Sequence, residues 1–260
     1  MRLAGASQLL VLEADFSPFH GKHPGQMMCN RYRMTANQAE LAARYGIASF
    51  PPDLQLATPE LFPDRTAWVI RQEDGERRLD TMSWGFPRKV PGKRIDKMTG
   101  KPVLLDTKVT NVRNYTSPFW ASALANPERR CLVPFTSFSE YGPGPAGKRP
   151  LFWFEVPSRP IVSFAGVWRP TESGAVFAFL TTKPNPLVAP IHPRAMPVLL
   201  DEEDEQRWLT CAFDDAVTLA KPFPSQLMSV QQAADPRDEA GRAGDDAGGD
   251  QNAQQPSLDL

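Results

Sequence analysis

Cys29 follows Met28 in the sequence, and its chemistry depends on where the mature chain begins. If translation starts at Met28 and this methionine is removed, Cys29 becomes the N-terminal residue. Its α-amine and thiol then lie on adjacent carbon atoms and together can close a five-membered thiazolidine ring on an aldehyde. An internal cysteine can form only a reversible hemithioacetal. The alternative is that Cys29 is an ordinary thiol, packed in the interior as a small apolar group.

Five further segments follow Cys29 and combine aromatic, charged and amide side chains. In chain order they are Trp84-Gly85-Phe86-Pro87, Thr110-Asn111-Val112-Arg113, Arg130-Cys131-Leu132-Val133-Pro134 leading to Phe138-Ser139-Glu140-Tyr141, Phe164-Ala165-Gly166-Val167-Trp168, and Ile191-His192-Pro193-Arg194-Ala195-Met196-Pro197. This set resembles the SRAP family, the SOS-response-associated proteins that process abasic sites. The resemblance covers residues 28–230.

The sequence departs from the family pattern, which reads roughly M-C-G-R, W-G-x-x-P, N-A-R, R-C-(L/I)-x-P-x-x-x-(F/W)-x-E-(W/Y), F-A-G-(L/I)-W and I-H-x-R-M-P. Asn30 stands where glycine is usual, Val112 where alanine is usual, and Tyr115 where an acidic residue is often found. The Trp-Gly segment is also one residue shorter. These changes fall on the expected DNA-contacting shell, so they affect the predicted substrate geometry more than the predicted reaction.

The resemblance implies that Cys29, Asn111, Glu140 and His192 carry the chemistry. An abasic site is in equilibrium with a ring-opened aldehyde, which an α-amine with a reference pKa of about 8 can attack at physiological pH. Glu140 is expected to supply the acid and base for imine formation, and His192 to protonate the sugar oxygen and assist later steps. The Asn111 amide is expected to hold the amine or a developing oxygen charge. Outside this context Glu140 would be an ordinary surface residue, His192 a structural residue and Asn111 a turn residue.

The DNA contacts implied by the resemblance involve arginine and aromatic residues. Arg31, Arg113 and Arg194 are expected to contact phosphates, because guanidinium pairs with phosphate oxygens through two hydrogen bonds. Trp84 and Gly85 are expected at the DNA, with Trp84 stacking on exposed bases and Phe86 as a second candidate. Trp84 is equally well suited to the core.

The charge of the chain limits how it can bind nucleic acid. The 260 residues carry a net charge of −1, so a nucleic-acid site must be a local patch. Basic residues do gather between residues 88 and 108, with Asp96 and Asp106 as the acids among them: Arg88, Lys89, Lys93, Arg94, Lys97, Lys101 and Lys108. This lysine-rich loop fits a solvated surface and a phosphate-binding segment equally well.

The three cysteines have no paired spacing, which argues against a disulfide framework and against a zinc site of the C-x-x-C type. Cys131 and Cys211 are expected to be packed thiols. No cofactor and no metal are predicted. No membrane partner is predicted either, because no run approaches the length of a membrane span. The expected location is the cytoplasm, with association to the nucleoid when the protein is bound to DNA, and the expected state is a monomer.

The chain is expected to contain one domain between two tails. Residues 1–27 are predicted to be an unstructured extension or to precede the true start, since the apolar run at 3–12 meets acidic residues and lacks a clear cleavage site. Residues 28–230 form the predicted SRAP-like domain. Residues 231–260 are rich in Asp, Gly, Ala and Gln and are expected to be disordered, because they bury too little to offset their ordering entropy.

Within the domain, the pattern favours an α+β fold made mostly of antiparallel strands with peripheral helices. Three helices are predicted, at 39–45, 118–125 and 201–209. The first follows a capping box at 35–38 and ends at Gly46, and the second begins after Ser117. A hairpin is predicted around Asp74-Gly75 between strands 66–72 and 77–86. Further strands are predicted at 131–138, 151–156, 161–168, 175–182 and 196–200. The resemblance adds that the sheet is strongly bent and barrel-like.

The resemblance therefore implies a protein that binds abasic sites in single-stranded or junction DNA and forms a thiazolidine crosslink through Cys29. The family also implies that the chain removes its own short leader and has an abasic-site lyase side activity. One alternative is a cysteine hydrolase that uses Cys29, His192 and Asn111 on an amide unrelated to DNA. Another is a non-catalytic DNA-binding module whose reactive terminus stays blocked by the extension.

Overall fold

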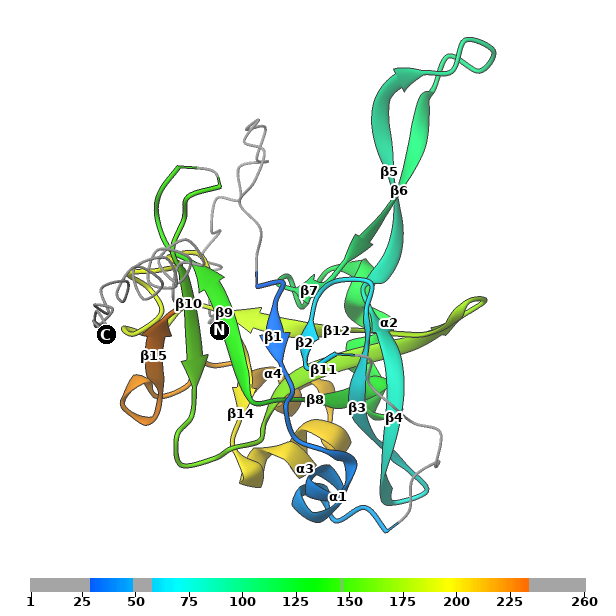
Figure 1. Cartoon of the computed structure of the whole chain (residues 1–260). Helices are drawn as coiled ribbons and strands as arrows, with labels where there is room; N and C mark the ends of the chain where they lie inside the picture. Colours follow the sequence, from blue (N-terminus) through cyan, green and yellow to red (C-terminus); the bar gives the residue numbers. More distant parts are fainter. Residues whose placement is uncertain (1–28, 49–57, 146, 234–260) are drawn as a thin grey trace, which may run out of the picture.

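A computed structural model describes residues 29–48, 58–145 and 147–233. A strand barrel lies at its centre (Figure 1), and the strand pairings show that five strands form it. Each strand of this barrel is hydrogen-bonded to the next, and the ring closes where β12 pairs with both β4 and β11. Four of the five pairings are antiparallel, and β12–β4 is parallel. The strands are β3 (Thr66–Glu73), β4 (Glu76–Trp84), β8 (Arg130–Phe135), β11 (Val162–Thr171) and β12 (Gly174–Thr182). The predicted α+β fold with a bent, barrel-like sheet is confirmed.

The β3–β4 hairpin forms as the sequence predicts. Asp74 and Gly75 both have positive φ angles, of 51° and 84°, and the flanking residues Glu73 and Glu76 are paired. A two-residue turn with both φ angles positive matches the right-handed twist of antiparallel strands, which favours Asp-Gly here. The hairpin therefore fixes the register of two barrel strands locally.

A second sheet lies against the barrel and consists of five strands in the order β15-β10-β9-β1-β2. The segment predicted as one strand at 131–138 is divided here, because the chain leaves the barrel at Thr136 and continues in the second sheet. This break places Glu140 outside the barrel ring. The strands are β1 (Tyr32–Arg33), β2 (Glu60–Leu61), β9 (Ser137–Tyr141), β10 (Leu151–Glu155) and β15 (Ser229–Gln232).

Short strands complete the barrel edges. β7 (Asn111–Val112) pairs in parallel with β12, while β13 (Met196–Pro197) and β14 (Leu199–Leu200) pair with β12 and β11. The predicted strand at 196–200 is thus two strands on two neighbours. β15 includes Gln231 and Gln232, which were expected to belong to the tail, whereas residues 234–260 and 1–28 lie outside the described residues.

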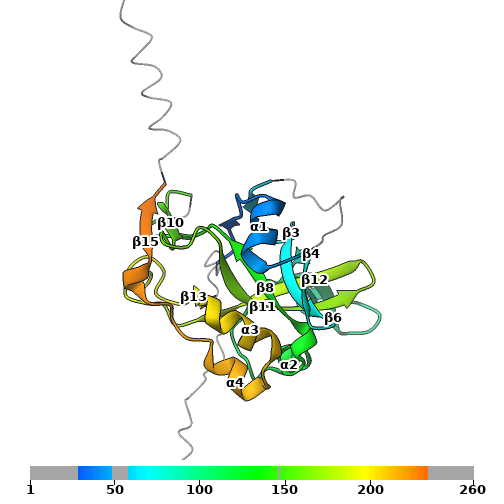
Figure 2. The same ribbon diagram turned by 90° about the horizontal axis from the view of Figure 1, so that it is seen from below.

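The helices lie around the barrel (Figures 1 and 2). α1 (Gln38–Tyr45) ends at Gly46, whose φ of 66° gives the predicted left-handed stop. Its capping box is formed by Asn37 and Glu40, two residues later than predicted, because the Asn37 side chain accepts from the Glu40 amide. The others are α2 (Pro118–Ala125), capped by Ser117 as predicted, α3 (Glu202–Thr210), α4 (Phe213–Thr218), and the 3₁₀ turns at Pro127–Arg129 and Ser225–Leu227.

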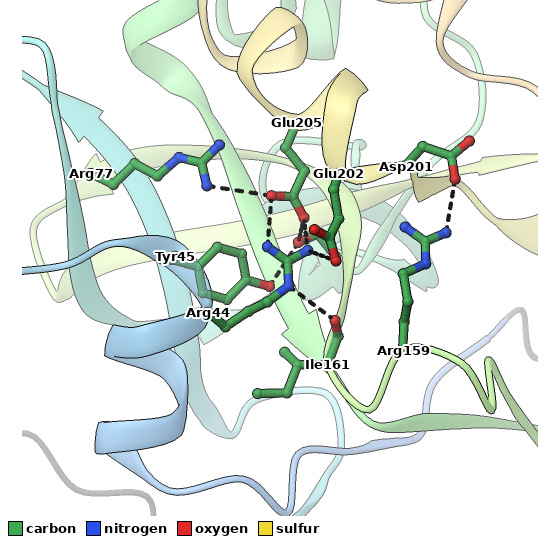
Figure 3. Close-up of polar contacts among 9 residues, drawn as sticks. Arg44, Tyr45, Arg77, Arg159, Ile161, Asp201, Glu202 and Glu205 are labelled. Carbon is green, nitrogen blue, oxygen red and sulfur yellow. Dashed lines mark hydrogen bonds and ion pairs between the residues drawn. The ribbon is translucent and has the colours of Figure 1, made fainter.

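A buried ion network ties α1 and α3 to the barrel (Figure 3). The Glu205 side chain, 1% exposed, accepts from Arg44 at 2.8 Å and from Arg77 at 3.4 Å. It also accepts a 2.6 Å hydrogen bond from Ser163, whose hydroxyl lies 2.8 Å from that of Tyr45. A buried carboxylate needs such partners because leaving it unpaired is costly. The network therefore fixes α1, the first helix after Cys29, against the barrel.

The basic stretch between residues 88 and 108 is a β-hairpin and not the loop expected from the sequence. β5 (Phe86–Ile95) and β6 (Pro102–Val109) pair with each other in a separate two-stranded sheet. Figure 1 shows this hairpin projecting from the barrel at the end away from α1 and α3. Within the described residues, no helix is both long and apolar enough to cross a membrane.

Candidate functional site

Cys29 is the first described residue and lies just before β1. Its side chain is buried, with 2% of its surface exposed. Burial raises the pKa of the thiol well above its ordinary value, and the nearby Glu140 charge raises it further. The thiol and the Glu140 carboxyl share a hydrogen bond. At neutral pH the sulfur is therefore a protonated thiol beside the Glu140 carboxyl.

Asn111 is held beside Cys29 by the parallel pairing of β7 with β12. Its amide nitrogen donates to the Cys29 carbonyl at 3.0 Å and to the Thr110 hydroxyl at 2.9 Å. The Asn111 side-chain oxygen is buried without a hydrogen-bond partner in the described residues. An unpaired buried acceptor at this position provides a binding point for an amine or hydroxyl hydrogen.

Glu140 projects from β9, which pairs with both β1 and β10. Burial raises the pKa of its carboxyl to about 8, although the hydrogen bond with Cys29 opposes this shift. Its Oε1 atom is buried and, among the described residues, has no hydrogen-bond partner. A carboxyl group with this pKa is mostly protonated at pH 7 and can both donate and accept a proton near neutrality.

His192 lies in the turn that leads into β13, where its backbone N–H donates to the Val188 carbonyl. Its Nδ1 atom is 2.9 Å from the Ala195 carbonyl oxygen, which can only accept, so Nδ1 carries the hydrogen and Nε2 the lone pair. Burial lowers the pKa of the imidazole, and the charges of Arg194 and Arg113 lower it as well. The hydrogen bond to Ala195 acts in the opposite direction and raises this pKa. Nδ1 is also 3.7 Å from the Glu140 Oε1 atom.

Arg113 and Arg194 lie together at the exposed side of this group. The Arg113 guanidinium donates to the Arg194 backbone carbonyl at 2.9 Å, and both residues are exposed to solvent. Their charges act on His192, which shows that they border the site. The two predicted phosphate contacts are therefore next to the predicted catalytic residues.

Arg31 differs from this pair because its guanidinium already has a carboxylate partner. It donates to Glu60 from Nε at 3.1 Å and from Nη2 at 2.5 Å, and it packs over the rings of Phe62 and Trp153. Glu60 also receives two hydrogen bonds from Arg33. The geometry that would grip a phosphate is thus used inside the protein, and Arg31 is the weakest of the three predicted DNA contacts.

Trp84 and Gly85 lie in the core and not on a DNA-facing surface. The Trp84 ring is 0% exposed, packs on Tyr32, Phe177 and Phe179, and donates from Nε1 to the Thr110 carbonyl. It therefore cannot stack on a base in this structure, and the alternative of a core role holds. Gly85 is buried and takes a φ of 130°, which permits the bend between β4 and β5. Phe86 is buried as well.

Thr110 is a site residue that the sequence did not reveal. Its hydroxyl accepts from the Asn111 amide while its carbonyl accepts from Trp84. The residue thus connects the barrel core to the amide that holds Cys29. Its place directly before Asn111 was the only sequence signal, and threonine is also common in strands and turns that have no part in a site.

The four predicted catalytic residues come from distant parts of the chain and form one group. Cys29 is hydrogen-bonded to Asn111 and Glu140, and Glu140 lies beside His192. The group contains a thiol, a carboxyl that is protonated near neutral pH, a neutral imidazole and an amide, which is a set suited to acid–base chemistry on a carbonyl compound. In the part of the chain that the structure describes, no cluster of three His, Cys, Asp or Glu side chains is arranged to hold a metal.

Solved structures share this fold. A protein from Bacteroides thetaiotaomicron superposes with a TM-score of 0.61 at 22% identity, covering 79% of this chain and 92% of that one. A protein from Bordetella bronchiseptica superposes with a TM-score of 0.62 at 20% identity, covering 79% and 100%. At this level of identity the similarity shows the fold alone.

Curated sequences give a second comparison. The chain is 27% identical over 220 residues to the abasic site processing protein YoqW of Bacillus subtilis (strain 168), covering 80% of this chain and 92% of that protein. It is 26% identical to the abasic site processing protein YobE of the same organism, covering 80% and 94%. The model of the family described as SOS response associated peptidase (SRAP) matches residues 28–235. The chain therefore belongs to the SRAP family.

Proposed function

We propose that this protein recognises abasic sites in DNA and forms a covalent thiazolidine crosslink through Cys29 as an N-terminal residue. The observation that supports the proposal most directly is the contact of Cys29 with both Asn111 and Glu140, next to His192. The family membership and the names of the two Bacillus relatives point to the same substrate. DNA is thus the proposed partner, with the abasic site in a single-stranded or junction region.

The proposed reaction requires an acid and a base at one carbon atom. The Cys29 α-amine adds to the aldehyde carbon and gives a carbinolamine, whose hydroxyl leaves as water when Glu140 donates a proton. Loss of water leaves a protonated imine. The thiol adds to the imine carbon, Glu140 accepts the thiol proton, and the nitrogen keeps its own hydrogen as the electron pair of the C=N bond returns to it. Aldehyde and aminothiol thus become thiazolidine and water. A carboxyl with a pKa of about 8 suits both transfers near neutral pH.

The proposed reaction requires a free α-amine, because an acylated nitrogen cannot form an imine. We infer that residues 1–28 are removed, and that the chain does this itself, in line with the peptidase in the family name. Strand cleavage through the imine is a proposed side activity. The cytoplasmic location and the monomeric state expected from the sequence stay predictions.

The test is to compare protein that begins at Cys29 with protein that keeps residues 1–28, each incubated with abasic single-stranded DNA and run on a denaturing gel. The protein beginning at Cys29 is expected to give a heat-stable adduct, and the longer one none until its leader is lost. Mass spectrometry of the purified longer protein over time follows leader removal, with Cys29→Ala as the variant expected to retain the leader. An equal heat-stable adduct from protein with an intact leader would exclude the thiazolidine.

The geometry supports the cysteine hydrolase alternative less well. A hydrolase would need a thiolate held by His192, but burial and Glu140 raise the pKa of the Cys29 thiol. The Nδ1–H of His192 is directed at Ala195, and the Asn111 amide binds the Cys29 carbonyl.

The non-catalytic binding module is the remaining alternative. It would be favoured if the protein beginning at Cys29 formed no adduct but still bound abasic DNA non-covalently.

A further inference from the structure

The β5–β6 hairpin, residues 86–109, projects from the barrel as an arm. Packing against the barrel does not explain which residue types the arm contains. Its strands pair only with each other in a two-stranded sheet, and a lone two-stranded sheet is at best marginally stable in water. Most of its side chains are exposed, including Met98 near the tip at 96%. Figure 1 shows the arm extending from the barrel into solvent. Packing against the barrel therefore does not determine the surface of the arm.

The arm concentrates positive charge in a chain that is otherwise acidic. Residues 86–109 contain seven Lys or Arg and two Asp, a net charge of +5, so the remainder of the chain carries −1 − 5 = −6. Lys89 pairs with Asp106, and Lys108 with Asp64 at the base. Within the described residues, four exposed cations toward the tip take part in no ion pair: Lys93, Arg94, Lys97 and Lys101. These four charges are available to an anionic partner.

The base of the arm is continuous with the candidate site. β5 begins two residues after Trp84, and β6 ends two residues before Asn111. Thr110 connects the two, because its carbonyl accepts from Trp84 and its hydroxyl from Asn111. The base of the arm therefore adjoins the residues that surround Cys29. The ten residues of β5 span about 33 Å, close to one turn of B-form DNA.

The chemistry of the arm fits double-stranded DNA better than single-stranded DNA. Residues 87–109 contain no Phe, Tyr or Trp, so the arm lacks the stacking surface that binds unpaired bases. A two-stranded ribbon fits the major groove of B-form DNA, and Lys and Arg along it reach phosphates on both sides. Exposed apolar side chains on the arm, among them Ile95 and Leu104, suit contact with base edges and sugars.

We propose that the arm binds the duplex that flanks the abasic site, with Lys93, Arg94, Lys97 and Lys101 contacting its phosphates. The proposal rests on the proposed function for its choice of DNA. The competing role is protection of strand edges, because lysine and proline on an unpaired edge discourage aggregation. Both strands of the arm are edges and carry these residues, so binding measurements have to separate the two roles.

The experiment compares non-covalent binding in a Cys29→Ala background of protein that begins at residue 29, so that it depends neither on crosslinking nor on leader removal. The arm variant is Arg94→Gln, Lys97→Gln and Lys101→Gln together. The matched control removes the same charge from exposed residues elsewhere, through Arg78→Gln, Arg207→Gln and Lys221→Gln. The probes are junction DNA with an abasic site in a single strand beside a duplex of about one helical turn, and a fully single-stranded DNA of the same abasic sequence.

On the junction DNA, the arm variant is expected to bind more weakly than the parent. The slope of log Kd against log salt concentration should fall by about two to three units, because each lost phosphate contact removes roughly 0.9 from this slope. The control variant is expected to match the parent, and the charge-conserving Arg94→Lys, Lys97→Arg and Lys101→Arg variant to restore binding. Equal losses on both probes would overturn the duplex assignment. Unchanged affinity and slope would leave edge protection as the role of the arm. If the wild-type protein formed no crosslink, the proposed function would be wrong, whereas the binding data would still decide whether the arm contacts the duplex.

Discussion

The Asn111 amide nitrogen donates to the Cys29 carbonyl oxygen at 3.0 Å, although the two residues are 82 positions apart in the chain. The same amide donates to the Thr110 hydroxyl, so its orientation is fixed from two sides. This contact holds the backbone of Cys29 next to Glu140 in a buried position. It follows that Asn111 sets where the amine and the thiol lie before a substrate arrives.

Replacing Asn111 by Ala is expected to slow crosslinking by about 10²-fold, because a displacement of about 1 Å at reacting atoms costs that much. The rate is measured by quenching the reaction with abasic DNA at increasing times. Asn126→Ala is the matched control, since Asn126 caps the turn after α2 and lies outside the site. Equal rates for the two variants would remove Asn111 from the mechanism.

Cys29→Ala and His192→Ala are expected to fail differently. In protein that begins at residue 29, the Cys29→Ala variant keeps a free amine but has no thiol. It can form at most a hydrolysable imine, so it should give no heat-stable adduct. His192→Ala should still form the adduct, slowed by roughly 10²-fold or more, the usual contribution of general acid–base catalysis. It should also release the adduct more slowly. Time courses of formation and of transfer to excess competitor DNA measure both steps, and wild-type rates in His192→Ala would leave Glu140 as the acid–base group.

Arg113→Ala and Arg194→Ala are each expected to weaken DNA binding and to reduce the slope of log Kd against log salt by about one unit. Both side chains are exposed beside His192, where a phosphate of the bound strand would lie. Arg31→Ala is the informative comparison, because its guanidinium is bound to Glu60. A larger slope change in Arg31→Ala than in the other two would show that the Glu60 contact opens when DNA binds.

Glu140→Gln is expected to stabilise the protein at alkaline pH. Burial raises the pKa of Glu140 from 4.5 to about 8, so between these values the folded state holds a proton that the unfolded state has lost. The stability of the wild type therefore falls as pH rises through this window, by up to about 5 kcal/mol. Glutamine has no proton to lose. The difference in free energy of unfolding between variant and wild type should grow from pH 4 to pH 9.

The control for this titration is Glu128→Gln, which changes an exposed glutamate. Urea unfolding at several pH values gives the free energies. A difference between Glu140→Gln and wild type that stays constant with pH would show that the Glu140 carboxyl is not held protonated by burial.

Glu205→Gln is expected to destabilise the fold by about 3–5 kcal/mol, because it removes the buried carboxylate that two partly buried arginines share. Arg44 and Arg77 are the cations concerned, with side chains 17% and 20% exposed. Glu202→Gln is the matched control on the same helix, since Glu202 is 53% exposed and lies 3.4 Å from Arg44. Its cost should stay within about 1 kcal/mol. Similar urea midpoints for the two variants would show that the Glu205 network stabilises the fold no more than the exposed Glu202 contact does.

Local features of the fold were determined by the sequence alone. Asp74-Gly75 specifies its two-residue turn, Ser117-Pro118 starts α2, and Gly46 ends α1, because each depends on the backbone preferences of a few adjacent residues. The capping box at 35–38 was misplaced because Thr35 and Asn37 are both good caps, and the local sequence does not decide between them.

The tertiary structure decided what distant contacts control. Nothing near residues 88–108 shows whether the basic stretch is a loop or a hairpin, because the two strands of the arm have no buried face to give an alternating pattern. Trp84 and Arg31 were assigned to DNA from their motifs, but the closed barrel surrounds Trp84 and the second sheet brings Glu60 to Arg31. The motifs named Cys29, Asn111, Glu140 and His192, whereas the distances and burial that raise the pKa of Glu140 arise only when β7, β9 and the turn before β13 pack together around Cys29.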